Sequence, residues 1–288
     1  MNIEVCDINN VYKLIKDKKY ELAEQEIDRL FQKSDNSEIG SKGRIYDFEN
    51  DFQMILYCNI SKNKSRLEWK RSFISDLYYQ KGFIFLEKQQ YENAMENLKE
   101  SLKWNPVKFQ SYMEILEIYT RMKDWNKFEE YFTKAIKVAI KPEEISKLYR
   151  KYAYLCIETN EYEKAYNVLR YSSLIYYREE NINEIKYLSS IEKINLKLSP
   201  DIGCINYIRE SGLEYNVQPE IINTYISIAN LLEEQLVKNE LNHESKINIL
   251  YRLVDIYTNL YIFNGDNKTH NLQMEAIKKY SEELKKSE

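Results

Sequence analysis

The sequence predicts an all-α fold, a right-handed superhelical solenoid of antiparallel helix pairs. Glycine occurs only 6 times and proline 4 times in 288 residues, so the tight turns of an all-β fold would lack their usual residues. Apolar residues recur at helical spacing, and a pattern of about 34 residues repeats along the chain. With 43% apolar residues, the chain has enough apolar material to form a core.

The net charge and the first residues of the sequence indicate which partners and which location to expect. The net charge of -4 is small and the two signs are interspersed, so no overall field attracts nucleic acid or an anionic membrane. No run approaches the roughly 18 apolar residues of a membrane span. The first residues, MNIEVCDINN, lack the basic and apolar regions of a signal peptide. We expect a cytoplasmic protein that binds neither membranes nor nucleic acid.

Residue types that act in catalysis or bind metal ions are few or isolated in the sequence. No phosphate-binding glycine loop, nucleophile elbow or zinc-protease motif occurs, and the carboxylate pairs are typical of solvated helix faces. Neither histidine has a partner at metal-ligand spacing. The cysteines are isolated and are expected to be free thiols: Cys6, Cys58, Cys156 and Cys204. We therefore expect no metal, no cofactor and no enzymatic activity.

The clearest repeat spans residues 75–108, where two helical patterns meet at Lys88-Gln89-Gln90. Small residues such as Gly82 and Ala94 allow two helix backbones to approach closely, and Pro106 closes the unit. The positions that define the pattern are Tyr78, Gly82, Phe85, Tyr91, Ala94, Leu98, Ser101 and Pro106.

This unit resembles the tetratricopeptide repeat, in which large, small and aromatic residues of one helix meet small and large residues of the next. The same register fits further units at 109–142, 146–179 and 4–37. Five of the eight alanines fall on its small-residue positions: Ala23, Ala94, Ala135, Ala153 and Ala165. The alternative is a bundle of unrelated helical hairpins. The resemblance implies a module that binds a protein or a peptide.

The rest of the chain is predicted to complete a single repeat domain over residues 1–288. Degenerate repeats and a capping helix are expected over 181–288, with helices at 183–198, 220–238, 247–263 and 272–284. Ser199-Pro200 is expected to start the helical segment that follows it. Residues 38–72 interrupt the array with a polar loop, a helix over 44–60 and a basic stretch over 61–72.

The basic stretch has two interpretations. Trp69 and five basic residues could grip nucleic acid or a phosphorylated partner. The alternative is a solvated loop whose tryptophan packs against the next repeat, because charge runs usually face solvent. The basic residues are Lys62, Lys64, Arg66, Lys70 and Arg71.

The first helix of each repeat is expected to line a concave, partner-binding surface. Counting positions within the units assigns eight residues to this surface or to its basic corner: Tyr79, Phe83, Met113, Arg121, Lys147, Arg150, Lys151 and Tyr154. Apolar side chains of a peptide would contact the first three, and its acidic group would meet the basic residues. Alternatively, the aromatics pack on a neighbouring helix and the cations pair with Glu143, Glu144 or Glu158.

Two functions remain open from sequence. The first is an interaction module or scaffold for another protein. The second is a regulator similar to the peptide-responsive quorum-sensing receptors of low-GC bacteria, without a DNA-binding head, because the repeats begin near Glu4. Repeat proteins that clasp chaperone C-termini match at Lys147 and Lys151 but differ at Tyr79, Phe83 and Glu114. The partner and the oligomeric state are not indicated by the sequence.

Overall fold

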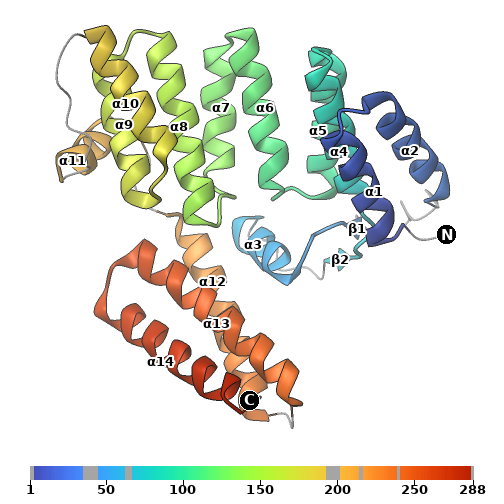
Figure 1. Cartoon of the computed structure of the whole chain (residues 1–288), viewed down its shortest axis with the longest axis vertical. Helices are drawn as coiled ribbons and strands as arrows, with labels where there is room; N and C mark the ends of the chain where they lie inside the picture. The colour runs from blue at the N-terminus through green and yellow to red at the C-terminus, as the bar shows by residue number, and fades with distance from the viewer. Residues whose placement is uncertain are drawn as a thin grey trace. The chain divides into compact units, whose positions relative to one another are not determined.

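The computed structural model describes residues 3–34, 45–61, 67–192, 202–213, 217–238 and 241–286. These residues are predominantly helical (Figure 1), which confirms the all-α prediction. The chain divides into two compact units, Met1–Val138 and Ala139–Glu288, and each is described by itself. Within the described ranges, no helix has the length and apolar character that a membrane crossing needs. The prediction of a single domain over 1–288 stays a prediction.

The described residues of unit 1 form three helix pairs, in addition to α3 (Asp51–Ser61). The pairs are α1 (Val5–Lys16) with α2 (Tyr20–Lys33), α4 (Ile74–Glu87) with α5 (Tyr91–Trp104), and α6 (Phe109–Met122) with α7 (Trp125–Ala135). The turn within each pair contains one residue in the left-handed conformation: Lys18, Gln89 and Lys123. Each pair packs on the next, so the first helices α1, α4 and α6 are neighbours in that order.

Ion pairs between α2 and α4 join the first helix pair to the second. The Lys81 Nζ atom lies 2.6 Å from Asp28 Oδ1, and the Lys88 Nζ atom lies 2.6 Å from Glu24 Oε2. Beneath them, apolar residues of α1, α2 and α4 share one core, which includes Val11, Ile27 and Leu77. The core and the ion pairs together hold the two helix pairs in register.

Close packing between α4 and α5 depends on Gly82. A Cβ atom at this position would lie 2.7 Å from Leu98 Cγ and 3.2 Å from the Ala94 carbonyl oxygen. The prediction that Gly82 and Ala94 let two backbones approach is therefore confirmed. All five alanines on small-residue positions are fully buried: Ala23, Ala94, Ala135, Ala153 and Ala165.

A segment between the first two helix pairs of unit 1 corrects a sequence prediction. A helix was expected over 44–60, but β1 (Ile45–Tyr46) pairs in parallel with β2 (Glu68–Trp69), and α3 (Asp51–Ser61) begins later. The reason is local, because the Asn50 side chain accepts the backbone N–H of Gln53 at 3.1 Å and so caps α3 at that point. We call residues 45–73 the inserted segment.

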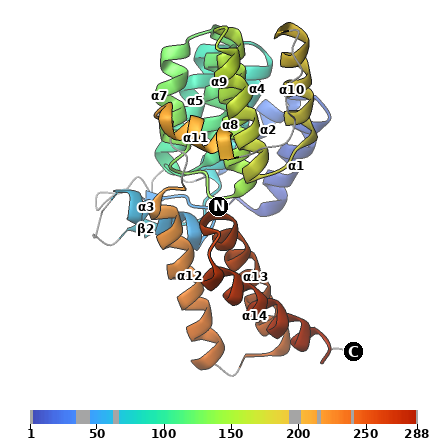
Figure 2. The ribbon, with the colours of Figure 1, turned by 90° about the vertical axis from the view of Figure 1, so that its left-hand side faces the viewer.

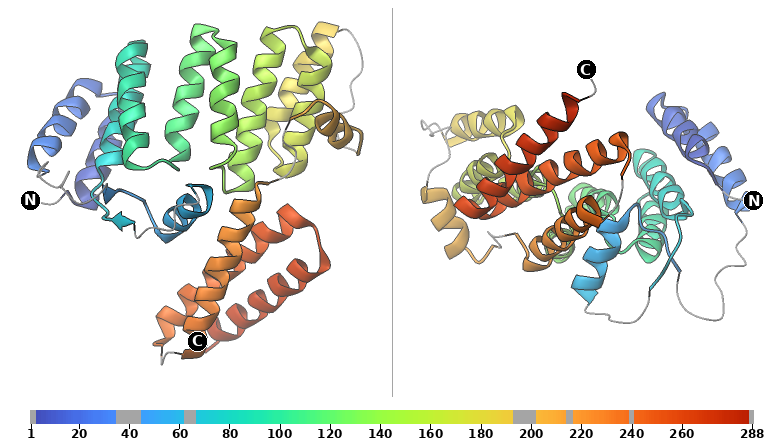
Figure 3. Two further views of the ribbon diagram at one scale, coloured as in Figure 1. Left: turned by 180° about the vertical axis from the view of Figure 1, so that it is seen from behind. Right: turned by 90° about the horizontal axis from the view of Figure 1, so that it is seen from below.

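Unit 2 contains α8 (Pro142–Glu158), α9 (Tyr162–Ile175), α10 (Glu179–Glu192), α11 (Ile202–Glu210), α12 (Pro219–Lys238), α13 (His243–Asn264) and α14 (Asn267–Leu284). Helices α8 and α9 form a pair, and both α10 and α11 lie against α9 (Figure 2). Helices α13 and α14, orange and red in Figure 3, form the last pair, with α12 beside α13. The Tyr225 hydroxyl of α12 donates to the Ile140 carbonyl oxygen at 2.8 Å.

Three helix starts in unit 2 lie earlier than predicted. Helix α10 begins at Glu179 rather than at residue 183, while residues 193–201, including Ser199-Pro200, lie outside the described residues. Side chains of Asn242 and Asp266 accept backbone N–H groups at 2.8 and 2.7 Å and so start α13 and α14 four or five residues before the apolar stripes. The apolar stripes indicate which face of a helix is buried, whereas the capping residues indicate where the helix begins.

A buried pair of serines recurs in two repeats. In unit 1, the Ser101 hydroxyl donates to the Ser75 carbonyl oxygen at 2.8 Å. In unit 2, the Ser172 hydroxyl donates to the Ser146 carbonyl oxygen at 2.8 Å. Both pairs are separated by 26 residues and join the start of a first helix to the end of a second. This shared contact supports the register that aligns residue 75 with residue 146.

We expect Gly82→Ala to destabilise the protein. Overpacking against Leu98 costs about 1–3 kcal/mol, which exceeds the gain of about 1 kcal/mol from alanine in a helix. Chemical denaturation should give a lower free energy of unfolding for Gly82→Ala. Adding Leu98→Ala should make the two losses less than additive, because the new methyl group then has room. Additive losses would contradict the close approach.

Candidate partner-binding surface

The predicted binding residues of unit 1 lie on α4 and α6. Tyr79 and Phe83 are one turn apart on α4 and are half-buried. Met113 on α6 leaves only 8% of its surface exposed, so it offers a partner little contact area. Arg121, exposed at the end of α6, lies 2.8 Å from Glu117 and 3.5 Å from Glu87, which joins α6 to α4. Its charge is therefore shared with two carboxylates.

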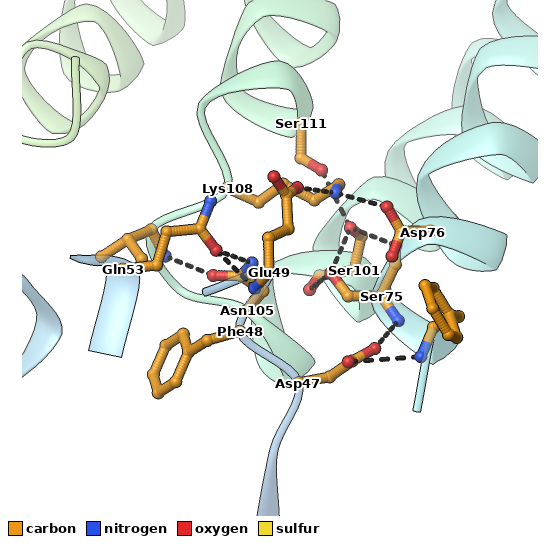
Figure 4. Close-up of polar contacts among 12 residues, drawn as sticks. Asp47, Phe48, Glu49, Gln53, Ser75, Asp76, Ser101, Asn105, Lys108 and Ser111 are labelled. Atoms are coloured by element: carbon orange, nitrogen blue, oxygen red, sulfur yellow. Dashed lines mark hydrogen bonds and ion pairs between the residues drawn. The ribbon is translucent and has the colours of Figure 1, made fainter. Parts of the chain in front are cut away.

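Five alternating charges lie where α4 and α6 begin, and we call them the ion chain: Asp47, Arg71, Asp76, Lys108 and Glu49. Figure 4 shows Asp47, Glu49, Asp76 and Lys108. The Lys108 Nζ atom, in a side chain 2% exposed, lies 2.5 Å from Glu49 Oε1 and 2.9 Å from Asp76 Oδ1. Arg71 Nη1 lies 2.7 Å from Asp76 Oδ2 and 3.1 Å from Asp47 Oδ1. Burial alone would raise the pKa of Asp76, but Lys108 and Arg71 lower it.

Asp47 caps α4 from the inserted segment. The residue before α4, Phe73, has a left-handed backbone and supplies no acceptor of its own. The fully buried Asp47 carboxylate instead accepts the backbone N–H groups of Ser72, Phe73 and Ser75 at 2.9, 3.2 and 2.9 Å. The Asp47 N–H donates to the Trp104 carbonyl oxygen at 2.9 Å. The inserted segment therefore ties the start of α4 to the end of α5.

Part of the predicted basic stretch is used internally. Arg71 belongs to the ion chain, and the Trp69 Nε1 atom donates to the Phe48 carbonyl oxygen at 2.9 Å within the inserted segment. Lys62, Lys64 and Arg66 lie outside the described residues. The Trp69 contact favours the structural interpretation of this residue. Nucleic-acid binding by the remaining basic residues stays an untested alternative to the solvated loop.

Polar groups of three elements gather around Tyr79. The Lys108 Nζ atom lies 5.6 Å from the centre of its ring. Burial raises the pKa of Tyr79, and Glu114 of α6, which hydrogen-bonds its hydroxyl, raises it further, as does Tyr12 of α1. Burial also raises the pKa of Tyr12, an effect that a hydrogen bond to Gln80 partly offsets. We call this group the tyrosine–carboxylate cluster: Tyr12, Asp76, Tyr79, Gln80, Lys108 and Glu114.

In unit 2, the predicted residues lie on α8. Lys147 is exposed, Lys151 is half-buried, and Tyr154 leaves 44% of its surface exposed. Arg150 Nη1 lies 3.9 Å from Glu180 Oε2 of α10, rather than beside the predicted Glu143, Glu144 or Glu158. Four of the eight predicted residues thus lie in each unit.

Most of the tyrosine–carboxylate cluster was not predictable from position within a repeat. Lys108 and Gln80 do not belong to the positions expected on a concave surface, and both are almost fully buried. Asp76 is also buried, with 5% of its surface exposed. Tyr79 was predicted from its position, and of the members that were not predicted Tyr12 had a usable signal, because in the unit that begins near Glu4 it occupies the same place as Phe83.

Comparison with protein families gives a match over two adjoining segments. Residues 75–108 and 109–139 match the family described as tetratricopeptide repeat. These two segments cover α4 to α7 in unit 1. No curated protein matches the chain by sequence.

We expect Lys108→Met to destabilise unit 1 strongly. Removing this cation leaves Asp76 and Glu49 without their shared partner, and breaking a buried ion pair costs about 3–5 kcal/mol. Lys103→Met, a matched change at an exposed lysine that pairs with Glu100, should cost less than about 1 kcal/mol. Thermal and chemical denaturation would measure both. Equal losses would show that the ion chain is not a stabilising network.

Unit 2 should respond to pH through Glu184 of α10. Burial raises its pKa to about 7 and Glu180 adds to the rise, against the opposing effect of Arg150. The folded state thus holds the proton more tightly than the unfolded state, for which the ordinary value is 4.5. This contribution to stability is complete below about pH 4.5 and is lost as the pH rises through about 7.

Glu184→Gln should remove this loss of stability at high pH. The neutral amide should make the variant more stable than the wild type at pH 8, by at most about 3 kcal/mol, and nearly equal to it at pH 4. The matched variant Glu179→Gln, at an exposed position of α10, should follow the wild type at both pH values. Glu144, whose pKa is also raised to about 7 by burial, should leave part of the pH dependence in place. Thermal melts across this range would test the difference.

Proposed function

We propose that this chain, which belongs to the tetratricopeptide repeat family, binds a partner protein or peptide on the face that α1, α4 and α6 contribute in unit 1. Tetratricopeptide repeats indicate a protein–protein interaction module, and the family is generally a non-catalytic scaffold. We call this surface the first-helix face.

The observation that carries the proposal is a set of incompletely buried aromatic rings on the first-helix face. Tyr12 of α1 leaves 44% of its surface exposed, and Tyr79 and Phe83 of α4 are half-buried. Tyr79 and Phe83 share one side of α4 because four residues separate them. Aromatic side chains supply large contact areas with few rotatable bonds, which suits them to binding surfaces.

Unit 2 offers a second set of candidate contacts on α8. Lys147 and Tyr154 are exposed there, so they are available to a partner. Arg150 is near Glu180, and its charge is partly balanced within the unit. We therefore propose Lys147 and Tyr154, ahead of Arg150, as the residues of unit 2 that contact a partner.

Affinity capture with matched variants tests the proposal. The tagged full chain should enrich a protein or a short peptide from lysate of its native cells, read by mass spectrometry. Tyr79→Ala/Phe83→Ala should reduce that enrichment at least tenfold, because it removes both rings from α4. Leu22→Ala, which truncates a 52% exposed residue on the second helix α2, should leave it unchanged.

Two outcomes would contradict the proposal. One is enrichment that the double variant and Leu22→Ala leave equally intact. The other is the absence of any enriched protein or peptide. Thermal melts of each variant must first show that it remains folded, since Tyr79 also contacts Lys108 and Glu114. A recovered short peptide without a protein would favour a peptide-responsive regulator.

A further inference from the structure

Two exposed tyrosines of unit 2 lie on α8 and α10, and we call them the tyrosine pair: Tyr154 and Tyr187. Tyr154 leaves 44% of its surface exposed, and Tyr187 leaves 56% exposed. The Tyr187 side chain makes no hydrogen bond or ring contact with any residue in the described ranges. Tyrosine combines a large apolar ring with a polar tip and is enriched at binding surfaces.

Buried hydrogen bonds place the starts of α8 and α10 at the same level. Near the end of α9, the Ser172 hydroxyl oxygen lies 2.9 Å from that of Ser146 in α8. The same Ser172 oxygen accepts the Asn181 side-chain amide of α10 at 3.0 Å. At 1.5 Å per residue, Tyr154 lies about 12 Å along α8 from Ser146, and Tyr187 about 9 Å along α10 from Asn181. The two rings therefore lie at similar heights on helices that begin at the same end of α9.

An ion pair shows that the two rings lie on the same side of these helices. Arg150 Nη1 of α8 lies 3.9 Å from Glu180 Oε2 of α10. Tyr154 comes four residues after Arg150, and four residues separate neighbours on one side of a helix. Tyr187 comes seven residues after Glu180, which is two turns on the same side. The tyrosine pair thus lies beside this ion pair, with one ring on each helix.

An exposed cation lies on the same side of α8. Lys147 comes seven residues before Tyr154, which places it two turns earlier on that side. None of the residues that the structure describes makes a hydrogen bond or an ion pair with the Lys147 side chain. An acidic side chain of a partner that contacts the tyrosine pair could therefore pair with Lys147.

The distance between the two helices favours one conformation of a bound peptide. Neighbouring helices lie about 10 Å apart, so the separation of the two rings is of that order. In a polyproline II helix, side chains three residues apart share one edge and are about 9 Å apart. Side chains on one face of a β-strand are about 7 Å apart, or about 13 Å at the next interval. The tyrosine pair fits the polyproline II spacing and neither β-strand spacing.

Hydrogen bonding favours the same conformation. The carbonyl oxygens of a polyproline II helix have no internal partner, whereas those of an α-helix are used within the helix. The Tyr187 hydroxyl has a proton to donate to such a carbonyl oxygen. Grooves lined by aromatic rings bind proline-rich segments because this conformation is formed before binding and loses little entropy.

We propose that the tyrosine pair binds a peptide segment in the polyproline II conformation, with two prolines three residues apart on the two rings and an acidic residue of the segment at Lys147. The proposal rests on the proposed function, because it names the conformation and chemistry of the partner at the contacts of unit 2. It adds Tyr187 of α10 to the binding residues, which the sequence predictions did not include.

Random 12-residue peptides displayed on phage, selected against the full-length chain, test the proposal. Selected sequences should share two prolines three residues apart and an aspartate or glutamate. A synthetic copy of the best one should lose affinity at least tenfold in Tyr154→Ala and in Tyr187→Ala, because each ring supplies one central contact. Tyr177→Ala, at a 68% exposed tyrosine just before α10, should leave the affinity unchanged. Thermal melts must show that each variant is folded.

Changes to the peptide and to the charge provide a second test. Moving one proline of the synthetic peptide by one residue should weaken binding at least tenfold, because both prolines can then no longer reach the rings. Lys147→Glu should also weaken binding, and the affinity of the wild type should fall as the salt concentration rises.

The outcomes separate the two proposals. Selected peptides without this proline spacing, an affinity that Tyr187→Ala leaves unchanged, or failure to select any peptide would overturn the polyproline II site. Apolar residues seven apart would identify a helical partner and would overturn it as well. In each case, a captured partner that is lost in Tyr79→Ala/Phe83→Ala would leave the proposed function standing. No selected peptide together with no captured partner would overturn both.

Discussion

The buried ion chain is the constraint on which unit 1 depends. Lys108 and Arg71 each lie between two carboxylates, and neither cation can be removed without leaving negative charge inside the protein. The ion chain joins the inserted segment, the start of α4 and the residue before α6. These elements must therefore become ordered together. The same ammonium group lies over the Tyr79 ring, so the geometry of the first-helix face follows from the ion chain.

The repeat architecture was predictable because its signals are local. Helix pairs of similar length with small residues at fixed positions leave a period in the sequence, and the buried alanines and Gly82 occupy those positions. The serine contacts at residues 75 and 146 repeat at the same spacing. Each of these features involves residues of one helix pair, where sequence distance and spatial distance agree.

The ion chain was not predictable, because its residues meet in space but lie far apart in the sequence. Asp47 caps a helix that begins 27 residues later, and Glu49 meets Lys108 across 59 residues, so no spacing rule connects them. The capping role of Asn50 and the pairing of β1 with β2 also displaced the expected helix start. Burial of Asp76 and Met113 depends on neighbours from other elements. Position within a repeat indicated the face of the helix but not what covers it.

The inserted segment also shows where this kind of protein can acquire new parts. Helix pairs in a linear array need only their neighbours, and the contacts between α2 and α4 are made by side chains whatever the length of chain between them. An addition at the junction between two pairs therefore leaves the stacking intact, whereas one inside a pair would part its helices. Here the inserted segment supplies a cap and a buried carboxylate to the next repeat, so the stability of that repeat depends on residues outside the repeat pattern.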